Sequence, residues 1–182
     1  MRYDPAMSPD LTRNAVPADA SAIAALHMRS WLAAYGAMAP AEAIRLLTED
    51  VRRDRWTAML GEPKARQVVR VIEADGAIVA VGMACAPTEP VFGDRGEVRH
   101  LYVDPDLRRS GLGRRMMAEL AGVIAGWGYA GLALAVVAQN KPALAFYAAL
   151  GGREIGRFID PGPVWTSDNA ALAWDDLPGL IS

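Results

Sequence analysis

The sequence has little that would point to a disulfide-linked, zinc-binding or membrane protein. Its single cysteine, Cys85, excludes a disulfide framework and any zinc site with more than one cysteine ligand. No stretch approaches the roughly eighteen uncharged apolar residues of a membrane span. The 19 basic and 21 acidic residues give a formal net charge of -2, so no bulk charge attracts nucleic acid or a membrane surface. We therefore expect neither as a partner.

What is present indicates one globular domain. A single hydrophobic core suits a chain of 182 residues, and a hydrophobic fraction of 52% is too high for intrinsic disorder. Residues 1–10 contain two prolines and one arginine and do not resemble a signal or transit peptide. We expect residues 1–10 to be disordered or loosely attached, residues 11–182 to form the domain, and the protein to be cytoplasmic.

Hydrophobic periodicity predicts alternating strands and helices. Asp19 is expected to cap the first helix, which Gly36 ends, and Asp75-Gly76 is a strong hairpin turn. The fold class is therefore α/β (α+β), a mixed central sheet of about six to seven strands flanked by helices. The expected strands are 11–16, 67–74, 77–86, 96–103, 131–137, 153–160 and 170–175, and the later helices are 40–60 (broken near 48–50), 111–127 and 141–150.

A glycine-containing basic loop runs directly into the helix at 111–127. Unpaired N–H groups at a helix start attract phosphate, and Gly111 and Gly113 would let an oxygen approach the backbone closely. Charge around this site comes from Arg108, Arg109, Arg114 and Arg115. The segment lacks the P-loop lysine, which disfavours a nucleoside triphosphatase. It also lacks the third glycine of the dinucleotide-binding fingerprint, which disfavours a dinucleotide-dependent oxidoreductase. The pattern indicates a pyrophosphate cradle, and an ordinary turn with solvated arginines is the alternative.

A second segment accompanies the loop at the right distance. Asn140 is followed by Ala143, Phe146, Tyr147 and Gly151, the pattern N-x-x-A-x-x-[FY]-Y-x-x-x-G. With the loop motif [RQ]-x-x-G-x-[GA], over residues 108–113, this arrangement resembles the GNAT superfamily of acetyl-CoA-dependent N-acetyltransferases. The resemblance covers roughly residues 11–175. It implies a GNAT-like acyl-CoA N-acyltransferase fold.

The resemblance also implies how acetyl-CoA would be held as cosubstrate. The loop amides would bind the pyrophosphate of coenzyme A, through Arg108, Arg109, Ser110, Gly111, Leu112, Gly113 and Arg114. The preceding strand would carry a bulge that splays it from its neighbour, so that pantetheine pairs with it through the backbone of Leu101, Tyr102 and Val103. Asn140 would lie close to the cofactor arm.

Two residues are candidates for proton transfer. Tyr147 is the candidate general acid, because a phenol can protonate the thiolate that leaves the thioester. Glu97 is the candidate base for the acceptor amine, since its place eleven residues before Arg108 is similar to that of the strand-borne glutamate in family members. A core tyrosine, a solvated glutamate and a water chain are the alternatives, and a bulge would decide whether His100 joins Glu97.

The acceptor is the open question. Trp31 and Tyr35 share a helix face, and the resemblance implies that this region forms a wall of the acceptor pocket, so they are candidate acceptor-binding residues, with core packing as the alternative. His27 is interpreted as structural and Cys85 as a buried hydrophobe. Trp165 and Trp174 are assigned to sheet packing, with the lining of a pocket as the alternative. We expect direct transfer of acetyl to a primary amine of a small molecule or peptide, without metal. Members of the family often pair through their late strands, so the resemblance also points to a homodimer. The alternative function is a non-catalytic acyl-CoA-binding regulatory domain.

Overall fold

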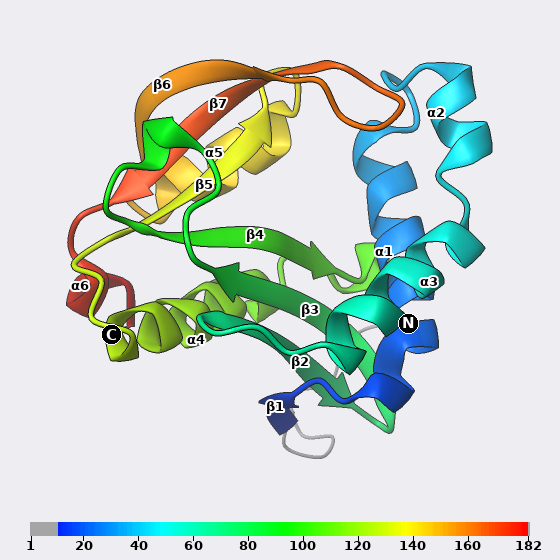
Figure 1. Cartoon of the computed structure of the whole chain (residues 1–182), viewed down its shortest axis with the longest axis horizontal. Helices are drawn as coiled ribbons and strands as arrows, with labels where there is room; N and C mark the ends of the chain where they lie inside the picture. Colours follow the sequence, from blue (N-terminus) through cyan, green and yellow to red (C-terminus); the bar gives the residue numbers. More distant parts are fainter. Residues whose placement is uncertain (1–10, 182) are drawn as a thin grey trace.

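The protein folds around one seven-stranded sheet with helices on both faces (Figure 1). The computed structural model describes residues 11–181. The strands are β1 (Leu11–Asn14), β2 (Gln67–Ala74), β3 (Ala77–Cys85), β4 (Gly96–Val103), β5 (Leu132–Val137), β6 (Arg153–Asp160) and β7 (Ser167–Trp174), in the order β1-β2-β3-β4-β5-β7-β6. The longer helices are α1 (Ala20–Tyr35), α2 (Ala41–Leu46), α3 (Glu49–Gly61), α4 (Leu112–Gly126), α5 (Lys141–Ala149) and α6 (Leu177–Ile181).

The two faces of the sheet bury separate apolar clusters. Met116, Leu120 and Ile124 of α4 are fully buried in the larger cluster, which also contains Tyr147 of α5. On the opposite face, α1 and α3 cover a second cluster that includes Leu26. Because the apolar positions of α4 recur every three or four residues, one side of the helix is buried against the sheet. The predicted α/β class and mixed sheet are confirmed.

The parallel pair β4 and β5 diverges early, which opens the middle of the sheet (Figure 1). Gly96 is opposite Leu132 and Glu97 is opposite Ala133, and within the described residues these are the only paired positions of the two strands. The other neighbours of these strands, β3 and β7, pair with them antiparallel. The part of β4 from Val98 onward therefore leaves its β5-side backbone groups without a strand partner.

A bulge interrupts β4 at Arg99. Val98 is opposite Ala84 and His100 is opposite Met83, so two residues of β4 occupy the space of one on β3. Such a bulge shifts the inward-outward alternation of all later residues in the strand. The bulge that the family resemblance implied is therefore present, one position before His100.

The bulge places Glu97, His100 and Tyr102 on the same face. Their partners on β3 are Cys85, Met83 and Val81, which alternate along the strand and all belong to the cluster under α1 and α3. Without the bulge, Glu97 and His100 would point to opposite faces. The structure thus answers the question left open by the sequence: His100 joins Glu97.

Most predicted element bounds agree with the structure to within one or two residues. The break near residue 48 is confirmed, where Thr48 accepts a hydrogen bond from Val51 N at 3.3 Å and begins α3. β7 begins three residues earlier than predicted, since Ser167 already pairs with Asp160. The short helix α6 was not predicted from the sequence. Asp176, the residue before it, accepts a hydrogen bond from Gly179 N at 3.2 Å and so begins the helix.

The prediction that Asp19 caps α1 through a helix amide is wrong. Its Oδ2 instead accepts a hydrogen bond from Val16 N at 2.8 Å, and both carboxylate oxygens accept from Arg13 at 2.7 and 3.0 Å. The Arg13 guanidinium beside Asp19 lowers the pKa of that carboxyl below its ordinary value. Asp19 therefore joins the start of α1 to Arg13 of β1. Its carboxylate does not cap α1, because Arg13 and Val16 N occupy both oxygens.

The predictions for residues 1–10 lie outside the described residues. Among residues 11–181, no helix has both the length and the apolar character needed to cross a bilayer.

Candidate active site

The gap between β4 and β5 leads to the start of α4. Gly111 is the residue before this helix, with φ +89° in the left-handed region, and no side chain within the described chain caps the helix start. Arg109 also has a positive φ of 65°. A loop with these dihedral angles turns sharply, and the first amides of α4 remain available to an anion.

The arginines of the loop divide into two groups. Arg108, Arg109 and Arg114 are exposed beside the helix start. Arg115 is half-buried and donates a hydrogen bond to Thr12 Oγ1 at 2.7 Å, so it is directed to β1. The expectation that all four arginines surround the cradle is wrong for Arg115, because one helical position changes the direction of the side chain by about 100°.

The two sequence motifs meet in space at Gly113. A Cβ on Gly113 would lie 3.0 Å from Cζ of Phe146, tighter than ordinary van der Waals contact. The absence of that Cβ allows α4 to approach α5 closely. The second glycine of the loop therefore serves helix packing, while the positive φ belongs to Gly111.

Two polar residues of the second motif are buried at α5. The Asn140 side chain accepts a hydrogen bond from Ala143 N at 3.2 Å and begins the helix. Tyr147 is 8% exposed, with its ring centroid 5.0 Å from that of Phe146 and 6.0 Å from that of Trp174. Trp174 thus packs in the core, as predicted.

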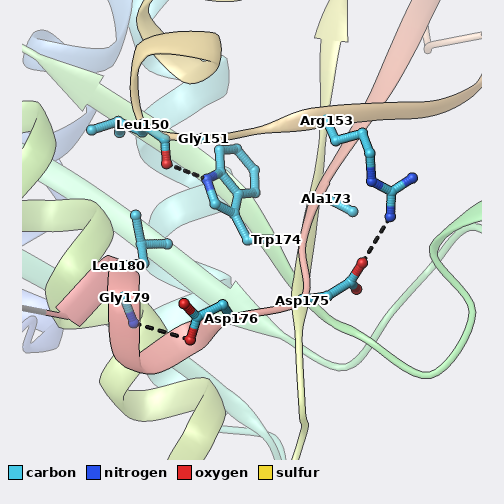
Figure 2. Close-up of a pocket in the computed structure, with 9 residues that line it drawn as sticks. All are labelled: Leu150, Gly151, Arg153, Ala173, Trp174, Asp175, Asp176, Gly179 and Leu180. Atoms are coloured by element: carbon cyan, nitrogen blue, oxygen red, sulfur yellow. Dashed lines mark hydrogen bonds and ion pairs between the residues drawn. The ribbon is translucent and has the colours of Figure 1, made fainter.

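The position of Trp174 is fixed by a hydrogen bond at the end of α5. Its Nε1 donates to the Leu150 carbonyl at 2.8 Å, and Figure 2 shows this bond beside the ion pair of Arg153 and Asp175. Trp174 and Leu150 also line a surface hollow of about 490 Å³ at this edge of the sheet. Trp174, one of the residues that line this hollow, also packs against the Tyr147 ring.

Three tyrosines approach each other across the gap. Burial raises the pKa of Tyr147 well above its ordinary value, and the nearby Tyr35 and Tyr102 raise it further. Burial also raises the pKa of Tyr35, and a hydrogen bond with the Asn140 side chain offsets part of this rise. At neutral pH these phenols are therefore protonated and able to donate.

Glu97 is buried and bonded to the segment before β4. It is 5% exposed, and its Oε2 accepts hydrogen bonds from Thr88 N at 2.9 Å and Thr88 Oγ1 at 2.7 Å. Its Oε1 lies 3.7 Å from NH1 of Arg99. Burial, followed by the Glu97 charge, raises the pKa of Cys85 to about 12, so the thiol stays protonated. The carboxylate is thus fixed on the face of the sheet that α1 and α3 cover.

An aromatic cluster formed by Trp31, Tyr35 and Trp165 lies at the end of α1. The ring centroids of Trp31 and Tyr35 are 5.8 Å apart, and that of Trp165 lies 6.2 and 5.8 Å from them. Trp165 comes from the loop between β6 and β7, which reaches toward α1 and α2 in Figure 1. The prediction that Trp165 serves sheet packing is therefore wrong.

The comparisons with known proteins agree with this geometry. The model of the Acetyltransferase (GNAT) family matches residues 26–151, which is most of the chain. The chain belongs to this family. None of the curated proteins matches it.

Solved structures share the GNAT fold over nearly the whole chain. The PaiA N-acetyltransferase from Thermoplasma acidophilum, in complex with coenzyme A, has a TM-score of 0.74 and 16% identity, covering 91% of this chain and 98% of its own. The yncA structure from Salmonella typhimurium, with its cofactor acetyl-CoA, has a TM-score of 0.65 and 21% identity, covering 92% of this chain and 94% of its own. The ribosomal-protein-alanine N-acetyltransferase from Brucella melitensis has a TM-score of 0.68 and 23% identity, covering 90% of this chain and 98% of its own.

One cluster in this GNAT domain escaped the sequence analysis. His27 of α1 contacts two side chains of α3. Arg52 NH1 lies 2.6 Å from its Nε2, and Trp56 Nε1 lies 3.2 Å from its Nδ1. The His27 ring also stacks on Tyr102 of β4, with centroids 4.1 Å apart. Only the i, i+4 spacing of His27 and Trp31 hinted at this arrangement, since the partners lie on other elements.

Proposed function

We propose that this protein transfers the acetyl group of acetyl-CoA to a primary amine by direct attack of the amine on the thioester. The observation that supports this most is the divergence of β4 from β5, which leads to a glycine-capped helix start flanked by three exposed arginines. The backbone of β4 and the start of α4 thus form one continuous track. Its length and chemistry suit an extended amide-containing arm that ends in a pyrophosphate.

The residues along the track fit acetyl-CoA. Leu101, Tyr102 and Val103 would bind the pantetheine amides through backbone groups that β5 leaves unpaired, apart from the Val103 carbonyl, which accepts a hydrogen bond from Ser30 Oγ at 2.9 Å. The loop residues Arg108, Arg109, Ser110, Gly111, Leu112, Gly113 and Arg114 would bind the pyrophosphate, mostly through N–H groups at the start of α4. Asn140, fixed at the start of α5, would lie beside the arm.

Tyr147 and Glu97 would manage the protons of the reaction. Acetyl-CoA supplies the thioester whose carbonyl carbon the amine nitrogen attacks. As the C–N bond forms and the C–S bond breaks, the Tyr147 phenol donates its proton to the departing sulfur, and its raised pKa keeps that proton available at neutral pH. Glu97 accepts the proton from the amine through Oε1, which lies 3.7 Å from NH1 of Arg99, whereas Oε2 accepts two hydrogen bonds from Thr88.

Trp31 and Tyr35 would bind the acceptor. They lie at the end of α1 with Trp165 against them, and Tyr35 is near enough to Tyr147 to raise the pKa of its phenol. Aromatic rings beside the proton donor supply an apolar wall for the body of the acceptor. Its amine would approach from the face that α1 and α3 cover.

Two measurements test the proposed function. Calorimetric titration with acetyl-CoA is expected to show binding at one site, and absence of measurable binding contradicts the proposal. Release of free thiol from acetyl-CoA across a panel of amines then separates an enzyme from a non-catalytic acyl-CoA-binding domain. Binding without amine-dependent thiol release would favour the latter.

A further inference from the structure

Arg52 of α3 is a buried cation without an acidic partner. Its residue is 4% exposed, and it forms no ion pair with any carboxylate among residues 11–181. Two of its nitrogens, Nε and NH2, are shielded from solvent and lack a hydrogen-bond partner within this part of the chain. Leaving a buried charged donor unpaired is costly, and native structures rarely do so without a reason.

The one polar contact of Arg52 leaves a shortage of acceptors. NH1 faces His27 Nε2, while Trp56 Nε1 faces His27 Nδ1, and both partners can only donate. Burial lowers the pKa of His27 to about 2, so the ring is neutral and has one acceptor nitrogen. In either tautomer, one further donor lacks an acceptor. The cluster is therefore built with more donors than the protein itself can satisfy.

The surrounding charges are also positive. Arg55 adds an unfavourable charge to both His27 and Arg52, and Arg99 does the same to His100, which stands 5.9 Å from His27 between ring centroids. Glu97, on the same face, is bonded to Thr88 and lies beside Arg99. The missing partner of Arg52 is thus an anion with hydrogen-bond acceptors.

The geometry of the free nitrogens specifies the anion. Nε and NH2 form the lateral edge of the guanidinium, whose parallel N–H groups match the two oxygens of a carboxylate. The guanidinium carbon lies 5.0 Å from the centroid of the Trp31 ring. An anion at this edge would therefore lie near Trp31, a member of the aromatic cluster that we assign to the acceptor. The His27 ring, which Arg52 contacts, stacks in turn on Tyr102 of β4.

We propose that Arg52 binds a carboxylate of the acceptor, so that the acceptor is an amine that also carries a carboxylate, such as an amino acid. This inference rests on the proposed function and names the acceptor class for the same site. The aromatic cluster would contact the remainder of the molecule. Because Nε and NH2 are shielded from solvent, binding requires the side chains around them to move.

The test uses matched probes that differ only in the carboxylate. L-methionine, L-phenylalanine and L-lysine are each compared with their carboxamides and with the decarboxylated amines, by acetyl-CoA-dependent thiol release. The wild-type protein is expected to prefer at least one carboxylate form by about 10- to 100-fold in kcat/KM, the range of a charge-assisted bidentate contact. In Arg52→Gln this preference should fall toward one, while Arg52→Lys should retain part of it.

The control is the neighbouring arginine. Arg53→Gln removes an exposed guanidinium that pairs with Asp50 at 2.7 Å, and it should leave the preference unchanged. Acetyl-CoA binding by calorimetry reports whether each variant is folded and whether the proposed function holds. If the wild-type protein binds acetyl-CoA but shows no carboxylate preference, the role of Arg52 alone is overturned. If the wild-type protein does not bind acetyl-CoA, the proposed function is contradicted.

A carboxylate could also belong to the acyl group, so succinyl-CoA is compared with acetyl-CoA at a fixed amine. No Arg52-dependent preference for succinyl-CoA is expected, because α3 packs against α1 on the acceptor side. An Arg52-dependent preference for succinyl-CoA over acetyl-CoA overturns the assignment to the acceptor.

Discussion

Tyr147 has surroundings that suit an acid rather than a nucleophile. Its ring packs between Phe146 and Trp174, and burial raises the pKa of its phenol. Because the rings on both sides hold it in place, removal of the hydroxyl should leave the packing unchanged. The oxygen alone can therefore be tested.

In Tyr147→Phe we expect kcat to fall by about 10²-fold, the range of a positioned general acid, because no phenol then protonates the departing sulfur. The dissociation constant of acetyl-CoA, measured by calorimetry, should stay within about twofold, since the proposed cofactor contacts are backbone groups and Asn140. Weaker cofactor binding with an unchanged kcat would contradict the acid role.

Glu97 is a second residue whose role depends on one atom. Oε2 accepts two hydrogen bonds from Thr88, so we expect Oε1, which lies 3.7 Å from NH1 of Arg99, to take the proton from the amine. In Glu97→Gln we expect a lower kcat/KM near neutral pH that recovers partly at high pH, where the free amine is already deprotonated. The measurement is the pH profile of thiol release. A profile parallel to that of the wild-type protein would favour a water chain as the base.

At the scale of elements, the start of α4 depends on the backbone of Gly111. Its φ of +89° is costly for any residue with a Cβ, while among residues 11–181, apart from its neighbours in the chain, no atom lies within 4 Å of the position that a Cβ would take. The conformation alone therefore explains the glycine, and the open side of the loop is where a phosphate would approach.

Gly111→Ala is expected to lower the free energy of unfolding by about 1–2 kcal/mol, the cost of a left-handed alanine, and to weaken acetyl-CoA binding. Gly122→Ala is the matched control, because a Cβ there also meets no atom within 4 Å but the residue lies in the helix interior. It should raise stability by about 0.5–1 kcal/mol. Denaturant titration and calorimetry measure both effects, and equal behaviour of the two variants would refute this account of the loop.

At the scale of the whole molecule, two half-buried histidines join the sheet to its helical cover. His27 of α1 and His100 of β4 both pack against Trp56 of α3. Burial lowers the pKa of His27 to about 2 and that of His100 to about 4, with positive arginines adding to both shifts. Both rings are therefore neutral in the folded protein at neutral pH.

This arrangement predicts lower stability in acid. The unfolded histidines bind protons below pH of about 6.5, whereas the folded ones do not until much lower pH, so the unfolded state gains protons first. The free energy of unfolding should fall as the pH decreases from about 6.5 to about 4, by up to about 1.4 kcal/mol per pH unit for each histidine. Denaturant titrations at several pH values measure this slope, and His100→Gln should make it shallower. Equal slopes in the two proteins would contradict the burial of a neutral His100.

The predictions from sequence succeeded where structure depends on near neighbours along the chain. The strands at 67–74, 96–103 and 153–160 have the predicted bounds, since alternation and turn residues are local signals. Asp19 was assigned the wrong partner because Arg13 on the preceding strand competes for its carboxylate.

The sequence by itself determined the order of elements, the glycine-capped start of α4 and the family of the fold, because these depend on spacing and local conformation. Only the tertiary structure decided which residues share a site. The bulge at Arg99 places His100 on the same face of the sheet as Glu97, and Trp165 of the loop between β6 and β7 contacts Trp31 of α1. Arg52 lies 25 positions from His27, and no local pattern could show that its lateral edge lacks a partner. Side-chain pairing across elements is a property of packing, which local periodicity does not encode.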